Sequence, residues 1–302
     1  MPRLLDGAWL GLLIAAGGAC NATPGQSAGV RDSSALAERA SRLAAQLAQA
    51  DTASDAPLAR WVLPHALAEI SGIALTPDQR LLAHDDEAGR IFEVDYRRGV
   101  IVKTFWVGTQ ILRDDFEAIT AVGNRIFLLA STGKLYAFAE GTDGSRVPFT
   151  VHDTGLDGEC EFEGLAFDPT AHALVLACKN VLAAGLKDFV VLYQLSLTDT
   201  TDARISRITI PLSQVIGTQG WKGFTPSDLD VDPGSGDYVI VSAQEKGLLR
   251  VTAAGQVVWS RPLPPGHDMA EGIAITRDSL LIVSDEAASA SVPADITLYR
   301  WP

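Results

Sequence analysis

The chain has 302 residues, of which 47% are hydrophobic, and a formal net charge of −13. This apolar content supports a large buried core and argues against a disordered chain. The negative charge argues against a nucleic-acid-binding protein and against a basic membrane-binding patch, because both functions need clustered Lys and Arg. The negative net charge favours the binding of cations or of basic partners.

The N-terminus has the pattern of an export signal. Arg3 precedes the apolar run AWLGLLIAA, residues 8–16, which is too short to span a bilayer and suits a signal peptide. The following GGAC, ending at Cys20, resembles a bacterial lipobox, in which the cysteine is lipidated. We therefore expect residues 1–20 to be a signal segment and the protein to be a periplasm-facing lipoprotein or an exported protein of the bacterial envelope. An ordinary cleaved signal and an uncleaved anchor are the alternatives.

Residues 21–57 are rich in Ala, Ser, Gly and Asp and are interpreted as a tether. Within the tether, residues 33–51 have high helix propensity. Ser33 or Ser34 is predicted to cap this short helix, with Glu38 near its first turn. We expect the helix to be a spacer.

From residue 58 to residue 302 the chain repeats. Each repeat is a short strand, a turn rich in Pro, Asp, Gly or Asn, a second apolar strand and further strands. The repeats begin EISGIALTPDQRLLAHDD, DFEAITAVGNRIFLLAST, EFEGLAFDPTAHALVLACK, PSDLDVDPGSGDYVIVSAQ and AEGIAITRDSLLIVSDE. Such units predict an all-β fold, a β-propeller, with five blades and six as the alternative. The last repeat is short, so residues 59–64 are predicted to supply its outer strand and close the ring.

Acidic residues recur where each repeat begins. In a propeller the first strand of each blade lines the central channel, so these residues are expected at one mouth of it. The equivalent positions are Ser71, Glu117, Glu163, Asp228 and Glu271. In the third repeat, Glu159, Glu161 and Glu163 alternate and are expected on one face of a strand.

A ring of carboxylates needs a cation, raised pKa values or bulk water. Oxygen ligands select Ca²⁺, which gives a hypothetical calcium site formed by Glu117, Glu163, Asp228 and Glu271. The second-choice ligands are Glu69, Asp85, Asp115, Glu161 and Asp285. Three alternatives stay open: a solvated rim, carboxylates bonded to backbone amides of neighbouring blades, and a salt bridge between Lys179 and Glu163.

Cys160 and Cys178 are expected on neighbouring strands, though not directly opposite one another. A disulfide between them would suit an oxidising compartment. Two buried free thiols fit the sequence equally well.

The repeat motifs resemble the SdiA-regulated domain family of bacterial envelope proteins, over about Trp61 to Trp301. This resemblance implies a β-propeller in the periplasm or at the envelope, and no established reaction. The acidic channel is more distantly similar to that of metal-dependent propeller hydrolases such as phytases and gluconolactonases.

Two classes of function follow. The favoured class is a monomeric, non-catalytic propeller that binds a small ligand or a protein partner at its acidic face. The alternative is a metal-dependent hydrolase of a phosphoester, ester or lactone, with Glu69 or His84 as the base. We expect His84 to be a side chain of the rim, with a raised pKa if it has a chemical role. Few Lys or Arg lie near the expected rim to hold an anionic substrate, which disfavours the hydrolase.

Overall fold

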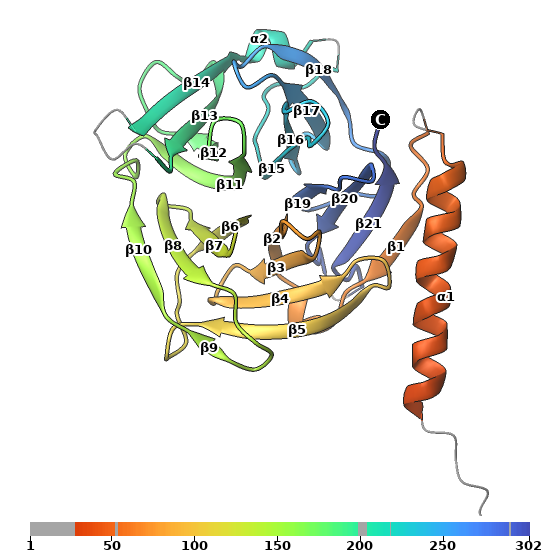
Figure 1. Ribbon diagram of the computed structural model, residues 1–302. Helices are drawn as coiled ribbons and strands as arrows, with labels where there is room; N and C mark the ends of the chain where they lie inside the picture. The colour runs from red at the N-terminus through yellow and green to blue at the C-terminus, as the bar shows by residue number, and fades with distance from the viewer. Residues whose placement is uncertain (1–27, 52–53, 199–203, 218, 290) are drawn as a thin grey trace, which may run out of the picture.

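The computed structural model describes residues 28–51, 54–198, 204–217, 219–289 and 291–302. The predicted signal segment, including Cys20, lies outside the described residues. The described chain forms a ring of five antiparallel sheets around a central axis, which confirms the five-bladed β-propeller (Figure 1).

Each blade is a four-stranded sheet, with a fifth short strand added to the first blade. Blade 1 consists of β2 (Ile70–Leu75), β3 (Leu81–Asp85), β4 (Arg90–Asp95), β5 (Val100–Val107) and the added β9 (Arg146–Val147). Blade 2 consists of β6 (Phe116–Val122), β7 (Arg125–Ala130), β8 (Lys134–Ala139) and β10 (Phe149–Asp153). Blade 3 consists of β11 (Cys160–Asp168), β12 (Ala173–Val181), β13 (Phe189–Ser196) and β14 (Ile205–Pro211). Blade 4 consists of β15 (Asp228–Val231), β16 (Tyr238–Ser242), β17 (Gly247–Val251) and β18 (Val257–Pro262). Blade 5 consists of β19 (Ala270–Ile275), β20 (Leu280–Asp285), β21 (Asp295–Arg300) and β1 (Ala59–Val62).

The hydrophobic core is divided among the five interfaces between neighbouring blades. One buried cluster lies at each interface, and each draws residues from the two blades that meet there. Because both faces of a sheet are covered, the middle strands are continuous apolar runs without alternation. In β20, for example, every residue is buried.

The ring is closed by β1, as predicted. Residues 59–62 pair antiparallel with β21 of blade 5. Trp61 also donates a hydrogen bond from its indole Nε1 to the backbone oxygen of Tyr96 in blade 1, at 2.9 Å. The first strand in the sequence therefore joins the last blade to the first.

The N-terminal helix differs from the prediction. Helix α1 (Ala28–Gln49) begins before Ser33 and Ser34, so neither serine is its N-cap. Leu43 is buried in the core cluster between blades 5 and 1, and Leu47 packs against that cluster. Figure 1 shows α1 beside β1 on the outside of the ring. The helix is thus docked on the propeller and is not a free spacer. The four-residue helix α2 (Leu212–Val215) lies in the connection between β14 of blade 3 and β15 of blade 4.

Candidate functional site

The N-terminal ends of the five inner strands meet at one mouth of the channel. We call the group formed by Glu117, Glu163, Glu271 and Lys179 at this end the acidic mouth. The three carboxylates interact electrostatically with one another and with the Lys179 ammonium. Three of the five positions that the repeats align therefore carry carboxylates that lie together at this mouth.

β-bulges set the direction of the side chains at these positions. Ser71, Glu117, Glu163 and Glu271 each fall at an irregularity in the pairing between the first and second strands of their blades. A bulge places two residues opposite one and bends the strand, which redirects the side chain. The acidic residues consequently leave the regular alternation of their strands and converge on the channel.

The three alternating glutamates of the third repeat have different partners. Glu159 lies 3.7 Å from the guanidinium of Arg207, and Glu161 accepts a hydrogen bond from the Asn180 amide at 2.5 Å. Only Glu163 belongs to the acidic mouth, because the strand pairing shifts on both sides of Phe162.

Lys179 is the central cation of the acidic mouth. Its Nζ forms an ion pair with Glu163, as the sequence suggested. Burial acts to lower the pKa of Lys179, but Glu163, Glu117 and Glu271 together raise it, so the ammonium stays charged. One positive charge therefore faces three carboxylates.

The carboxylates are held largely out of water, and their pKa values show it. Burial, with repulsion from Glu163 and Asp115, raises the pKa of Glu117 to about 8. Burial also raises the pKa of Glu163 to about 7, in spite of its contact with Lys179, and it raises the pKa of Glu271. At neutral pH the acidic mouth consequently holds protons that free glutamates would have lost.

Asp228, the remaining member of the predicted calcium set, has a different role. Its Oδ2 accepts a hydrogen bond from the backbone amide of Ile273 in blade 5, at 3.0 Å. Asp230 makes the equivalent bond to the amide of Ile275, at 2.7 Å. These carboxylates join blade 4 to blade 5, which is the backbone-amide alternative that the sequence left open.

The second-choice ligands Asp115, Glu161 and Asp285 lie close enough to repel Glu117, Glu163 and Glu271, respectively, but the second-choice ligands are engaged elsewhere or exposed. Glu69 is exposed and lies near Asp86, whose pKa is raised by burial and by Glu69. The partners of Asp85, Asp115 and Asp285 are, respectively, the Ala88 amide, the Ser131 hydroxyl and the His267 ring. Among the described residues no group of three or more His, Cys, Asp or Glu could hold a metal ion.

The prediction for His84 is wrong. Its side chain is fully buried, not at the rim, and burial lowers its pKa to about 4. Nδ1 lies 2.9 Å from the Asp85 backbone oxygen and donates to it. A Cβ added to Gly72 would lie 2.8 Å from Nε2 of His84, so this ring fills the space beneath the glycine. A neutral ring packed there cannot contact a substrate.

A disulfide joins Cys160 to Cys178, with 5.6 Å between their Cα atoms. Cys178 is paired in the sheet with Phe162, not with Cys160, so the bridge crosses the ladder diagonally. It therefore ties together the two strands that carry Glu163 and Lys179.

The free energy of unfolding of the protein should depend on pH through the titration of Glu117. Its folded pKa of about 8 is above the usual 4.5, so the folded state binds the proton more tightly, and stability falls as pH rises through this window. Glu117→Gln should remove this loss and raise the free energy of unfolding at pH 9 by about 1–2 kcal/mol. Thermal melts between pH 5 and pH 9 measure it. The exposed Glu87→Gln on the same face is the control, and an equal pH slope in all three proteins would contradict the assignment.

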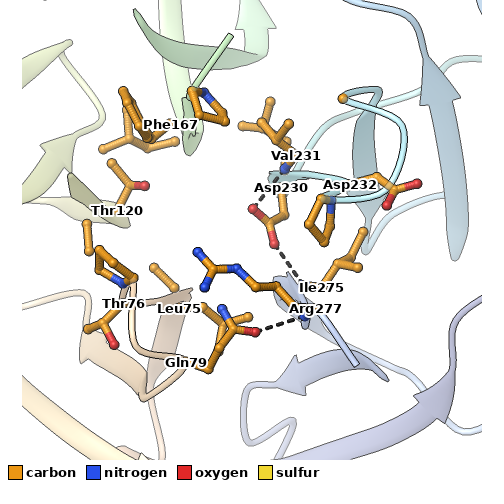
Figure 2. A pocket seen from close by; sticks show the side chains of 18 of the residues that line it. Leu75, Thr76, Gln79, Thr120, Phe167, Asp230, Val231, Asp232, Ile275 and Arg277 are labelled. Atoms are coloured by element: carbon orange, nitrogen blue, oxygen red, sulfur yellow. Dashed lines mark hydrogen bonds between the residues drawn. The ribbon is translucent and has the colours of Figure 1, made fainter. Parts of the chain in front are cut away.

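A cavity that the sequence did not predict lies at the opposite mouth of the channel. It has a volume of about 480 Å³ and is lined by the C-terminal ends of the inner strands and the turns that follow them (Figure 2). Asp230 and Arg277 are among its lining residues. In the sequence, the only sign of this cavity is the polar residues of the turns that follow the inner strands.

The comparisons with known proteins bear on the fold. No protein-family model and no curated protein matches the chain. Among solved structures, it is similar to a glutaminyl cyclase of Myxococcus xanthus, with 12% identity, a TM-score of 0.54, and coverage of 81% of this chain and 95% of that one. It is also similar to the PQQ-bound form of an aldose sugar dehydrogenase of Streptomyces coelicolor, with 12% identity, a TM-score of 0.50, and coverage of 80% and 97%. At such low identity the similarity shows the β-propeller fold alone.

In the described part of the chain, no helix is long and apolar enough to span a membrane.

Proposed function

We propose that this chain is a non-catalytic, envelope-tethered propeller of the SdiA-regulated domain type, whose acidic mouth binds the cationic group of a ligand or partner protein. The tether is the N-terminal segment, held by a lipid on Cys20 or by a signal anchor. The observation that carries the proposal is the group of three desolvated carboxylates, Glu117, Glu163 and Glu271, around a single ammonium. A cation that enters the group replaces bound protons and relieves the repulsion between the carboxylates.

Apolar residues on the same face suggest the rest of the ligand. Ile111 precedes β6, Leu182 follows β12 and Met269 precedes β19, so all three lie at the ends of strands that form the acidic mouth. Their side chains are 53%, 54% and 37% exposed. A lysine or arginine flanked by apolar groups would match this combination of a charged centre and an apolar surround.

The described residues fit a calcium ion poorly. The Lys179 ammonium already contacts Glu163, and one oxygen of Asp228 already accepts a hydrogen bond from the backbone amide of Ile273 in blade 5. Calcium needs six to eight oxygen ligands, which this group does not gather. We therefore propose an organic cation, and the calcium site stays a prediction to be tested beside it.

The hydrolase is the weaker candidate. Its proposed base must touch the substrate, but His84 is fully buried. Glu69 is exposed, and its carboxylate has no hydrogen bond or ion pair among the described residues that would orient it. Turnover of phosphoester, lactone or ester probes would revive this alternative.

Binding can be tested with a matched pair of peptides. The first is acetylated, amidated leucyl-lysyl-leucine; in the second, norleucine replaces the lysine and removes only the charge. By calorimetry the lysine peptide should bind at least tenfold more tightly at pH 7.5, and with release of protons. Its affinity should rise from pH 6 to pH 9, because Glu163 and Glu117 lose their protons in this range.

Two variants test whether binding of the lysine peptide depends on the acidic mouth. Glu117→Gln should weaken binding of the lysine peptide about tenfold, whereas Glu87→Gln should not change it. Equal affinity for the two peptides would contradict the proposal. A calcium-dependent rise in melting temperature that Glu117→Gln abolishes would support the calcium site instead.

A further inference from the structure

The cavity at the opposite mouth is lined by residues from all five blades. Its volume, about 480 Å³, lies within the usual range of about 300–1,000 Å³ for small-molecule sites. Apolar side chains, including Leu75, Phe167, Val231 and Ile275, form much of its lining. It can therefore take the body of a small organic molecule.

Arg277 is the unusual residue of this cavity. Among the described residues, no hydrogen bond, ion pair or ring contact engages its guanidinium, and the hydrogen bond that Arg277 makes comes from its backbone amide. Figure 2 shows this guanidinium extended toward the middle of the ring of lining residues. A guanidinium is a planar fork of donors that matches a carboxylate.

The backbone beneath Arg277 is held in place. Its amide donates to Oε1 of Gln79 in blade 1, at 2.8 Å. Gln79 itself has a φ of +66°, which fixes the turn that presents its side chain. The base of the arginine is thus anchored across the junction of blades 5 and 1, while its charged end is not engaged.

The two acidic residues of the lining are already engaged. Asp232 forms an ion pair with Arg250 at 3.1 Å and accepts a hydrogen bond from the Gly234 amide. Asp230 accepts hydrogen bonds from the amides of Val231 and Ile275, and desolvation raises its pKa to about 7. Neither carboxylate is paired with Arg277, and Asp230 carries less than a full negative charge at neutral pH.

We propose that this cavity binds a small amphipathic carboxylic acid, with its carboxylate on Arg277 and its apolar body against Leu75 and Phe167. The site is separate from the acidic mouth, which prefers the opposite charge. The protein would therefore bind an anion at one end of the channel and a cation at the other.

Three probes of nearly equal shape test this proposal: phenylacetate, 2-phenylethanol and 2-phenylethylamine, which differ in charge. By calorimetry at pH 7.5, phenylacetate should bind at least tenfold more tightly than the alcohol. Arg277→Gln should reduce its affinity to that of the alcohol. Arg125→Gln makes the same charge change on β7, where the guanidinium lies over the Phe127 ring, and should leave the affinity unchanged.

The outcomes separate the possibilities. Preference for the amine, or equal binding of phenylacetate by the wild type and by Arg277→Gln, would overturn the proposal. Absence of saturable phenylacetate binding to the correctly folded wild type at 20 mM, roughly the weakest affinity such a site should have, would also overturn it. Glu117→Gln should not alter phenylacetate binding, so a failure here is distinct from a failure at the acidic mouth.

Discussion

A chain that begins at Pro64 should unfold at a temperature at least about 10 °C below that of a chain that begins at Asp55. Both chains lack α1, but only the shorter one lacks β1. The shorter chain loses the antiparallel pairing of β1 with β21. It also loses two apolar side chains, the partly buried Trp61 and Leu63, which is 5% exposed. Burial of large apolar side chains is worth about 1.5–3 kcal/mol each, and together with the lost hydrogen bonds we expect about 5 kcal/mol.

Loss of β1 also leaves polar groups without partners. Arg60 forms an ion pair with Asp295, which is buried and would lose that partner. The edge of β21 would be exposed to solvent and to pairing with other chains. Circular dichroism melts and size-exclusion chromatography measure both effects. Equal melting temperatures for the two chains would contradict the assignment of β1 as the closing strand.

Removal of the disulfide is expected to have the second largest effect. Cys160 and Cys178 are 18 residues apart, and a bridge over a loop of this size stabilises by about 3 kcal/mol through the entropy of the unfolded chain. The double variant Cys160→Ala, Cys178→Ala should therefore melt about 6 °C or more below the wild type. Because the bridge ties β11 to β12, the variant should also weaken binding of the lysine peptide at Glu163 and Lys179.

A reductant provides the control. Dithiothreitol should lower the melting temperature of the wild type and leave that of the double variant unchanged. Alkylation of the unreduced protein, followed by intact-mass measurement, should modify neither cysteine. Two alkylated thiols would show that the bridge is absent.

Part of the acidic mouth followed from the sequence. Equivalent positions in repeated strands occupy equivalent places around an axis, so Glu117, Glu163 and Glu271 were placed together by the repeat alone. The contact between Lys179 and Glu163 followed from the hairpin between them. The first argument uses only the repeat of the blades around the axis, and the second uses only strand pairing within a blade.

Other features of the site depend on distances that strand periodicity does not contain. Register shifts on both sides of Phe162 take Glu163 out of the regular strand pairing, and strict alternation does not anticipate such shifts. His84 belongs to an acidic segment of the sequence, yet it packs beneath Gly72, because glycine leaves room there for a ring. Asp228 bonds a backbone amide of the neighbouring blade, which lies 45 residues away in the chain.

The sequence by itself determined the architecture of this protein. Its five repeats of apolar strands and turn residues specify a propeller, and its N-terminal apolar strand at residues 59–62 specifies the closure, because each strand must find a partner for its backbone groups. Tertiary structure decided which charges are buried and which are engaged. Desolvation of Glu117, burial of His84 and the unengaged guanidinium of Arg277 arise where different blades meet, and such contacts depend on packing between segments that are distant in the chain.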